Sequence, residues 1–463
     1  MDDNTAAFVT TDRRLLLAAV IAWLVVAVLG VVLGPPLGHD EAAFAVSARG
    51  GGPPWVYRSA GVTEIARIGV LLGGEAWQLR IASALLGALI VVGAYAVGAA
   101  TVSARTGAWA AAVIAGAHPM ALRSSELIGD LPATGCILLG IAVLAGELSR
   151  EDGPRWRFVL AAPAFAAAFY LRYASAPVIA IAGVAAAALW WRAILRRPLP
   201  VIVAALALAV LLLPHVLQSL AATGKLFGIL QVSSKMPRRA YAGEGLVTYL
   251  APGNPFRYYG ALVAPLLVAG LAGLARPPAR WRPSIFLGIV AVGQVLAIGV
   301  QSHAQPRYIF VAITLLVVLG SDAVSRFAPR PLRVAALPLV VLAWIGVVVT
   351  VPFYARHLSE ARGPLVAAAA VVRTDAGGER CIVVAKVVTQ LMWYTRCSEQ
   401  RLTAPEKLPP WSLDRKTYVV SVPRAMVAIE AVLEPRPALV RELAMPPPAR
   451  VWRVVPAPTT PGL

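Results

Sequence analysis

Two adjacent acids, Asp40 and Glu41, follow the first long apolar run of the chain, which Pro35-Pro36 ends. Acidic residues are scarce, with 23 Asp and Glu against 42 Lys and Arg. A carboxylate within hydrogen-bond reach of a hydroxyl group can remove its proton as a general base. The pair is therefore a candidate catalytic base if it lies at a membrane face, the alternative being solvated loop charge.

The composition is that of an integral membrane protein. Of the 463 residues, 59% are hydrophobic and only 14% are charged, and the mean hydropathy is +0.72. A soluble domain carries about 25% charged residues. The net charge of +19 would suit a nucleic-acid binder. However, the arginines lie in short links between apolar runs, which indicates membrane topology and no nucleic-acid partner.

The apolar runs predict an α-helical polytopic fold with about 11 transmembrane helices, since a span needs about 20 residues. The predicted spans lie near residues 15–34, 79–102, 107–122, 131–148, 158–170, 173–191, 199–218, 258–275, 284–300, 309–322 and 334–354. Two long polar segments interrupt them, at 35–77 and 219–257. Within the first, 41–48 and 62–72 are predicted to form short helices along the membrane interface.

The links on the same side of the membrane as the amino terminus are short and basic. We therefore expect this side to be cytoplasmic. These links hold Arg13, Arg14, Arg105, Arg150, Arg155, Arg157, Arg192, Arg196, Arg197, Arg276, Arg280, Arg282, Arg326, Arg330 and Arg333. Both long polar segments and the carboxyl-terminal tail then lie on the outer face of the plasma membrane.

Residues 356–463 follow the membrane part, 1–355, and differ from it in alternating predicted strands and helices, as a small extracytoplasmic α/β domain would. The strands are predicted at 381–385, 417–422 and 450–455, and the helices at 365–372, 387–394 and 425–433. Cys381 and Cys397 lie in this domain. In an oxidising exterior they either form a disulfide or remain two thiols, and their spacing does not decide between these states.

Further ionisable residues fall on the same outer face as the acid pair. Charged groups at a membrane boundary are costly unless paired or wet, so they usually mark a site. Snorkelling of arginines to lipid headgroups and capping of helix ends are the alternative interpretations. The candidates are His39, Arg123, Glu126, Asp130, Arg172, His303, Arg307 and Tyr308.

The sequence indicates no metal centre and no resident cofactor. His39, Asp40 and Glu41 are adjacent, and adjacent side chains rarely chelate one ion. There is no His pair at helical spacing and no carboxylate cluster of the calcium type. A glycine-rich phosphate loop is also missing, so a nucleotide donor bound from the cytoplasm is not expected.

Three short motifs together resemble the GT-C glycosyltransferases, which include protein O-mannosyltransferases, aminoarabinose transferases and actinobacterial mannosyl- and arabinosyltransferases. The Asp40-Glu41 pair resembles the Asp-Glu motif of their first external loop. The link Pro119…Arg123…Asp130 is similar to the family's segment between spans three and four. The run from His303 to Tyr308 is similar to the family's late His-x-x-x-Arg-aromatic motif.

The resemblance implies inverting transfer of a sugar from a polyprenyl-phosphate donor to a glycan, lipid or protein acceptor of the cell envelope. Mannose or arabinose is the sugar expected. Asp40 is then the general base, while Glu41 orients the acceptor or an arginine. The cations expected to balance the leaving phosphate are Arg58, Arg67, Arg123, Arg172 and Arg307, with Arg123 and Arg307 favoured by motif position.

Two other functions fit a chain of this composition. A lipid or glycolipid transporter usually has inverted repeats and a site near mid-bilayer, whereas no repeat is evident here and the charges lie at one face. A non-catalytic assembly protein of the cell envelope would not need the intact acid pair.

Overall fold

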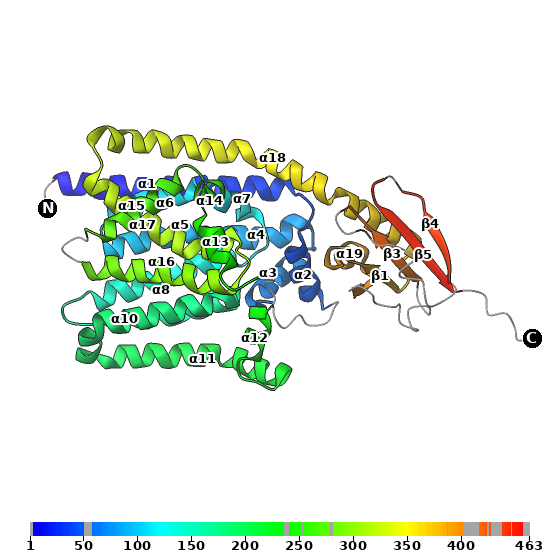
Figure 1. The fold of residues 1–463 in the computed structure, drawn as a ribbon, viewed down its shortest axis with the longest axis horizontal. Coiled ribbons are helices and arrows are strands. Elements are labelled where there is room, and N and C mark those ends of the chain that lie inside the picture. Colours follow the sequence, from blue (N-terminus) through cyan, green and yellow to red (C-terminus); the bar gives the residue numbers. More distant parts are fainter. Residues whose placement is uncertain are drawn as a thin grey trace, which may run out of the picture. The chain divides into compact units, whose positions relative to one another are not determined.

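A computed structural model describes residues 3–50, 58–235, 240–251, 253–276, 281–386, 388–401, 416–423, 426, 438–445 and 447–456. The chain divides into two compact units (Figure 1). The helical unit comprises Met1–Val32, Val56–Val62 and Arg80–Val351. The mixed unit comprises Leu33–Trp55, Thr63–Leu79 and Pro352–Leu463.

The described residues form mostly α-helices, joined in places by 3-10 turns (η). The helices are α1 (Asp3–Leu33), α2 (His39–Arg49), α3 (Ala60–Leu71), α4 (Ala76–Gly87), α5 (Leu89–Thr101), α6 (Ala104–Ala115), α7 (His118–Leu122), α8 (Asp130–Leu148), α9 (Ala161–Leu171), α10 (Ala176–Arg196), α11 (Pro198–Thr223), α12 (Gly228–Lys235), α13 (Glu244–Leu250), α14 (Asn254–Tyr259), α15 (Val263–Leu274), α16 (Trp281–Gln301), α17 (Phe310–Phe327), α18 (Arg330–Ala376) and α19 (Thr389–Thr395). The 3-10 turns are η1 (Arg123–Ser125), η2 (Trp156–Leu160), η3 (Tyr173–Ser175) and η4 (Pro306–Ile309).

Within the described residues, 8 helical segments are long and apolar enough to cross a membrane, as expected for a multi-pass protein. These are Asp12–Leu33, Ala76–Thr101, Asp130–Leu148, Tyr173–Arg196, Pro198–Thr223, Trp281–Gln301, Pro306–Phe327 and Arg330–Ala376. Two predicted spans fall on the shorter apolar helices Trp156–Leu171 and Val263–Leu274. The remaining predicted span, 107–122, falls on α6 and α7.

Helices α8 and α17 are the most buried of these segments. Helix α8 packs against α5 and α9, and α17 packs against α15 and α16. The close crossings depend on small residues: a Cβ added at Gly135 would lie 2.5 Å from the backbone of Leu89, and one at Gly270 would lie 2.5 Å from Leu316 O. Tight packing at the centre therefore fixes the amino-terminal ends of α8 and α17, which both carry candidate site residues.

Hydrogen bonds join four of the basic links in pairs. Arg196 donates a hydrogen bond to Glu151 O at 3.0 Å, which joins the link after α8 to the link after α10. Arg326 likewise donates to Arg276 O at 2.7 Å. Three of the links predicted on the opposite side supply Asp130, Arg172 and Arg307, which form the cluster described below.

The mixed unit contains a five-stranded sheet of order β2-β1-β3-β5-β4 (Figure 1). The strands are β1 (Cys381–Ala385), β2 (Ser398–Arg401), β3 (Lys416–Ser421), β4 (Ala438–Leu443) and β5 (Arg450–Pro456). Strands β2, β1 and β3 are parallel, whereas β3, β5 and β4 are antiparallel. Strands β1, β3 and β5 were predicted. The sequence analysis missed the polar strand β2 and strand β4, and the predicted helix 425–433 falls outside the described residues except for residue 426.

The boundary expected at residue 355 falls inside one continuous helix, because α18 runs on to Ala376. Beyond the apolar run its sequence remains helix-forming, with many alanines and an Arg356–Glu360 ion pair of 2.8 Å at i,i+4 spacing. The predicted helix 365–372 is therefore the last part of α18. In addition, the first polar segment belongs largely to the mixed unit, where α2 packs against α19.

Cys381 and Cys397 are joined by a disulfide, with their Cα atoms 4.8 Å apart. The bond encloses α19, because Cys381 begins β1 and Cys397 follows the helix. The third cysteine, Cys136, is a buried free thiol in α8. Of the two states that the sequence left open, the structure has the disulfide.

We expect a polyethylene glycol maleimide to add to one cysteine of the denatured, non-reduced protein and to all 3 after reduction, as judged by gel mobility. A Cys136→Ala variant serves as the control, because it should take up no reagent before reduction. Uptake at all cysteines without reductant would contradict the disulfide.

Candidate functional site

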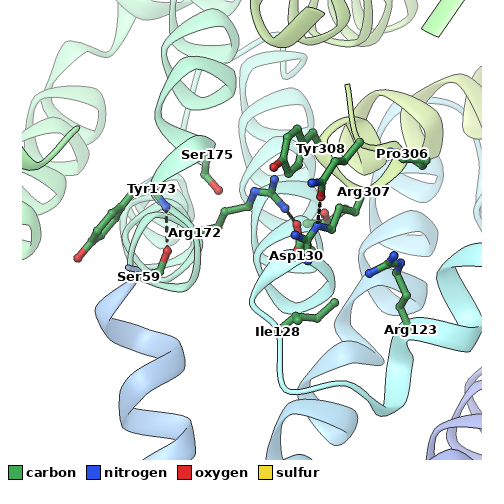
Figure 2. Close-up of polar contacts among 12 residues, drawn as sticks. Ser59, Arg123, Ile128, Asp130, Arg172, Tyr173, Ser175, Pro306, Arg307 and Tyr308 are labelled. Atoms are coloured by element: carbon green, nitrogen blue, oxygen red, sulfur yellow. Dashed lines mark hydrogen bonds and ion pairs between the residues drawn. The ribbon is translucent and has the colours of Figure 1, made fainter. Parts of the chain in front are cut away.

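A buried cluster of opposite charges occupies one end of the helical unit (Figure 2). Arg172 Nη1 forms an ion pair with Asp130 Oδ1, and Arg307 Nη1 lies 3.8 Å from Asp130 Oδ2. The side chains are only 10% (Asp130), 18% (Arg172) and 16% (Arg307) exposed. Charges this buried need partners. The structure thus brings together three residues that the sequence placed in separate links.

The helix ends position two of these charges. Asp130 is the first residue of α8, and Arg172 directly follows α9, where its N–H donates to Ala168 O at 2.9 Å. A carboxylate at a helix amino terminus and a cation at a carboxyl terminus both interact favourably with the helix dipole. The local structure therefore stabilises each charge before the two side chains meet.

Tyr308 lies beside both guanidinium groups (Figure 2). The Cζ atom of Arg172 is 4.7 Å from the centre of its ring, and that of Arg307 is 5.8 Å away. At these distances the ring attracts both cations. His303 lies edge-on to the same ring, with the ring centres 6.1 Å apart. Tyr308 and His303 therefore lie beside the charged cluster.

Gln305 joins His303 to Arg307 within this motif. Its Oε1 accepts a hydrogen bond from Arg307 Nε at 2.8 Å, and its Nε2 lies 3.2 Å from His303 Nε2. Gln305 lies within the run from His303 to Tyr308, but no role was predicted for it from the sequence. Its place between His303 and Arg307 was the signal that could have indicated one.

Three side chains from other helices fix the backbone of this link. Tyr249 donates to Gln305 O at 3.0 Å and Tyr259 donates to Pro306 O at 3.2 Å. Gln294 donates to Tyr308 O at 3.0 Å and accepts from the N–H of Ala312 at 2.6 Å. Burial raises the pKa of Tyr249, so its hydroxyl remains a proton donor. Gln294 was recognisable as a lone amide in an apolar run, whereas nothing local marks the tyrosines.

The segment after Arg58 is attached next to Arg172. The N–H of Tyr173 donates to Ser59 Oγ at 3.3 Å (Figure 2). The N–H of Ala60 donates to Tyr173 Oη, also at 3.3 Å. These bonds hold Ser59 and Ala60, which follow Arg58, against Tyr173, which follows Arg172. Arg58 thus lies in the same unit as the cluster, on a segment tied to it.

Two glycines allow this close approach. A Cβ added at Gly129 would overlap Leu171 O, and one at Gly61 would lie 2.9 Å from Tyr170 O. Both contacts involve backbone at the end of α9, which has little freedom to move. Because Gly129 directly precedes Asp130, its missing side chain is what lets Asp130 reach Arg172.

Arg123 and Glu126 form an ion pair of their own, with 3.2 Å between Nη1 and Oε2. The backbone that follows is held by Ser83, whose hydroxyl lies 3.1 Å from both Glu126 O and Ile128 O. Arg123, one of the predicted phosphate ligands, has a side chain that is 36% exposed and is held by a neighbouring acid.

In the mixed unit, Asp40 and Glu41 occupy the first turn of α2, but their surroundings differ. Glu41 Oε2 accepts the N–H of Gly38 at 2.7 Å and lies 3.6 Å from Arg362 Nη1, with its side chain only 3% exposed. Arg362 also donates to Pro36 O at 2.5 Å. Asp40 is half-buried. Glu41 therefore caps the helix and holds an arginine that the sequence analysis did not predict.

The remaining predicted residues of the mixed unit have separate surroundings. His39 Nδ1 lies 2.7 Å from Thr389 Oγ1. Arg67 pairs with Glu64 at 2.7 Å, with the two side chains 52% and 60% exposed. An ion pair this exposed contributes little stability. Among the described residues, no group of three or more His, Cys, Asp or Glu side chains is arranged to hold a metal ion.

We expect Gly129→Ala to lower the free energy of unfolding in detergent by about 1–3 kcal/mol, the usual cost of inserting atoms into a packed region. Gly183→Ala in α10 is the matched control, since an added Cβ there meets nothing within 4 Å. Its effect should be neutral or slightly stabilising. Equal thermal stability of the two variants would contradict the close contact between Gly129 and Leu171.

The sequence matches the family described as dolichyl-phosphate-mannose-protein mannosyltransferase over residues 62–217. A search of curated proteins finds no match.

Several solved structures resemble the whole chain. ArnT from Cupriavidus metallidurans bound to undecaprenyl phosphate has a TM-score of 0.66 and 15% identity, covering 96% of this chain and 98% of its own. The oligosaccharyltransferase AglB from Archaeoglobus fulgidus, solved with an inhibitory peptide and a dolichol-phosphate, has a TM-score of 0.53 and 13% identity, covering 84% and 64%. Arabinofuranosyltransferase AftD from Mycobacteria has a TM-score of 0.52 and 16% identity, covering 96% and 40%. The chain thus has a fold similar to that of these membrane glycosyltransferases, and its residues 62–217 match a mannosyltransferase family.

Proposed function

We propose that this protein transfers a sugar, with inversion, from a polyprenyl-phosphate donor to a cell-envelope glycan, lipid or protein at the outer face of the membrane. The observation that carries the proposal is the buried cluster in which Arg172 and Arg307 share Asp130. A transporter would need the same lipid-phosphate contacts but no general base, so the proposal can be tested at Asp40.

The charge of the cluster suits a phosphate. Two guanidinium groups and one carboxylate leave one positive charge in excess, in a place mostly shielded from solvent. A charge in such surroundings attracts an anion more strongly than it would in water. Arginine also binds phosphate oxygens with paired, charge-assisted hydrogen bonds. Asp130 pairs with both arginines, and Tyr308 lies against both.

In the proposed reaction, Asp40 accepts the proton of the acceptor hydroxyl. The hydroxyl oxygen forms a bond to the anomeric carbon while the bond from that carbon to the phosphate oxygen breaks on the opposite face. The electron pair of that bond passes to the phosphate, where Arg172 and Arg307 balance the charge that develops. We assign the base to Asp40 because it is the first acid of the Asp-Glu motif, while Glu41 accepts a hydrogen bond from Gly38 and lies beside Arg362.

Two of the similar structures contain lipid phosphates of this class, undecaprenyl phosphate in ArnT and a dolichol-phosphate in AglB. They support a polyprenyl-phosphate donor here by analogy of fold. Arg58 and Arg123 are further candidates for donor contacts, whereas the exposed pair of Arg67 with Glu64 makes Arg67 a weaker one. Mannose and arabinose are the first sugars to test, and no added cofactor or metal is expected.

The proposal includes about 11 crossings, with the amino terminus in the cytoplasm and residues 356–463 outside. The hydrogen-bonded pairs of basic links support this orientation. The disulfide supports an oxidising compartment for the mixed unit, because such bonds persist outside the cytosol.

We expect the purified protein to consume at least one polyprenyl-phosphate sugar. Asp40→Asn should lower kcat by about 10²- to 10⁴-fold, the range expected when a general base is lost, with donor binding retained. Arg172→Gln should weaken donor binding and also lower kcat by about 10²- to 10³-fold, because the leaving phosphate loses a cation.

The control for both is Arg356→Gln, which removes an arginine whose side chain is 80% exposed and paired with Glu360. Its kinetics should match those of the unmodified protein. If Asp40→Asn retained full turnover, or if movement of an unhydrolysed donor across vesicles were the only activity, the transferase proposal would be wrong.

A further inference from the structure

Within the mixed unit, helix α2, which carries Asp40, is held by α19 of the carboxyl-terminal domain. We propose that α19 positions Asp40 for catalysis, with Thr389 as the central positioning residue. The inference rests on the proposed function, since it assigns Asp40 as the base. It gives the extracytoplasmic domain a role in catalysis, because the domain would hold the catalytic base in position.

The chain that enters α2 is fixed first. Both backbone polar groups of Leu37 bond to α19: its N–H donates to Tyr394 Oη at 2.7 Å, and its carbonyl accepts from Gln390 Nε2 at 3.0 Å. Leu37 is fully buried. Buried backbone groups are costly to leave without partners, so these two side chains determine where the chain lies just before Asp40.

The first and last turns of α2 are fixed as well. Thr389 Oγ1 lies 2.7 Å from His39 Nδ1 and 3.4 Å from His39 O. At the other end, the guanidinium of Arg49 lies 3.7 Å from the centre of the Trp393 ring. Contacts at both ends prevent α2 from rotating or sliding, and Asp40 directly follows the residue that Thr389 holds.

Helix α19 is itself anchored. The disulfide between Cys381 and Cys397 ties the residues after α19 to the first residue of β1, the second strand in the sheet order. Helix α2 has a second anchor in Arg362 of α18, which contacts both Glu41 and Pro36 O. The position of Asp40 is thus set by the sheet through α19, and by α18 through Arg362.

A matched pair of variants tests the role of Thr389. Thr389→Val keeps the shape of the side chain but lacks the hydroxyl, and we expect it to lower kcat by about tenfold, since small displacements of a catalytic group are costly. The donor KM should change by less than about twofold, because phosphate binding lies elsewhere. Thr389→Ser retains the hydroxyl and should restore kcat to within about threefold of the unmodified protein.

Hydrogen exchange of the amides in 39–46 provides a readout that does not depend on activity. It should be faster in Thr389→Val and in Tyr394→Phe than in the unmodified protein. Tyr418→Phe, which removes a hydrogen bond to Asp375 in the same domain, controls for general loosening and should leave this exchange unchanged.

Unchanged kcat in Thr389→Val, with or without faster exchange, would overturn the positioning role. Equal exchange in the Thr389→Val and Tyr418→Phe variants would do so too, since it would reduce the effect to general stability. If the unmodified protein transferred no sugar at all, the proposed function would fail and this inference with it. The exchange data would still report whether α19 holds α2.

Discussion

The site of the helical unit depends on two ion pairs, in which the Asp130 carboxylate is shared between Arg172 and Arg307. These pairs join the start of α8, the end of α9 and the turn before α17, and none of these charges would be stable at such burial without the others. The glycine contacts of α8 and the hydrogen bonds from Gln294, Tyr249 and Tyr259 serve the same end. They leave the chain little freedom to separate the two cations.

Much of this site could be predicted from the sequence. The alternation of basic and polar links assigned Asp130, Arg172 and Arg307 to one end of the bundle, because each crossing reverses the side on which the next link lies. The residues that hold the links could not be found this way. Tyr249 and Tyr259 contact backbone atoms about 50 residues away, a pairing that only the packed helices create.

The acids Asp40 and Glu41 also show what the sequence alone cannot distinguish. In the sequence Asp40 and Glu41 are equivalent neighbours, and only the contacts with Gly38 and Arg362 reveal that Glu41 is a structural residue. Likewise, the apolar strands β1, β3 and β5 were predicted, whereas the polar strand β2 has no such signal and depends on its pairing with β1. The continuation of α18 beyond its apolar run was missed because hydrophobicity marks the membrane and not the end of a helix.

The central claim is that Arg172 and Arg307 form the binding site for the donor's phosphate. An experimental structure with polyprenyl phosphate bound tests it most directly. The account predicts phosphate oxygens about 2.7–2.9 Å from guanidinium nitrogens of both arginines, the distance of charge-assisted hydrogen bonds. A phosphate bound to other cations, with the Asp130 cluster unchanged and out of contact, would contradict it.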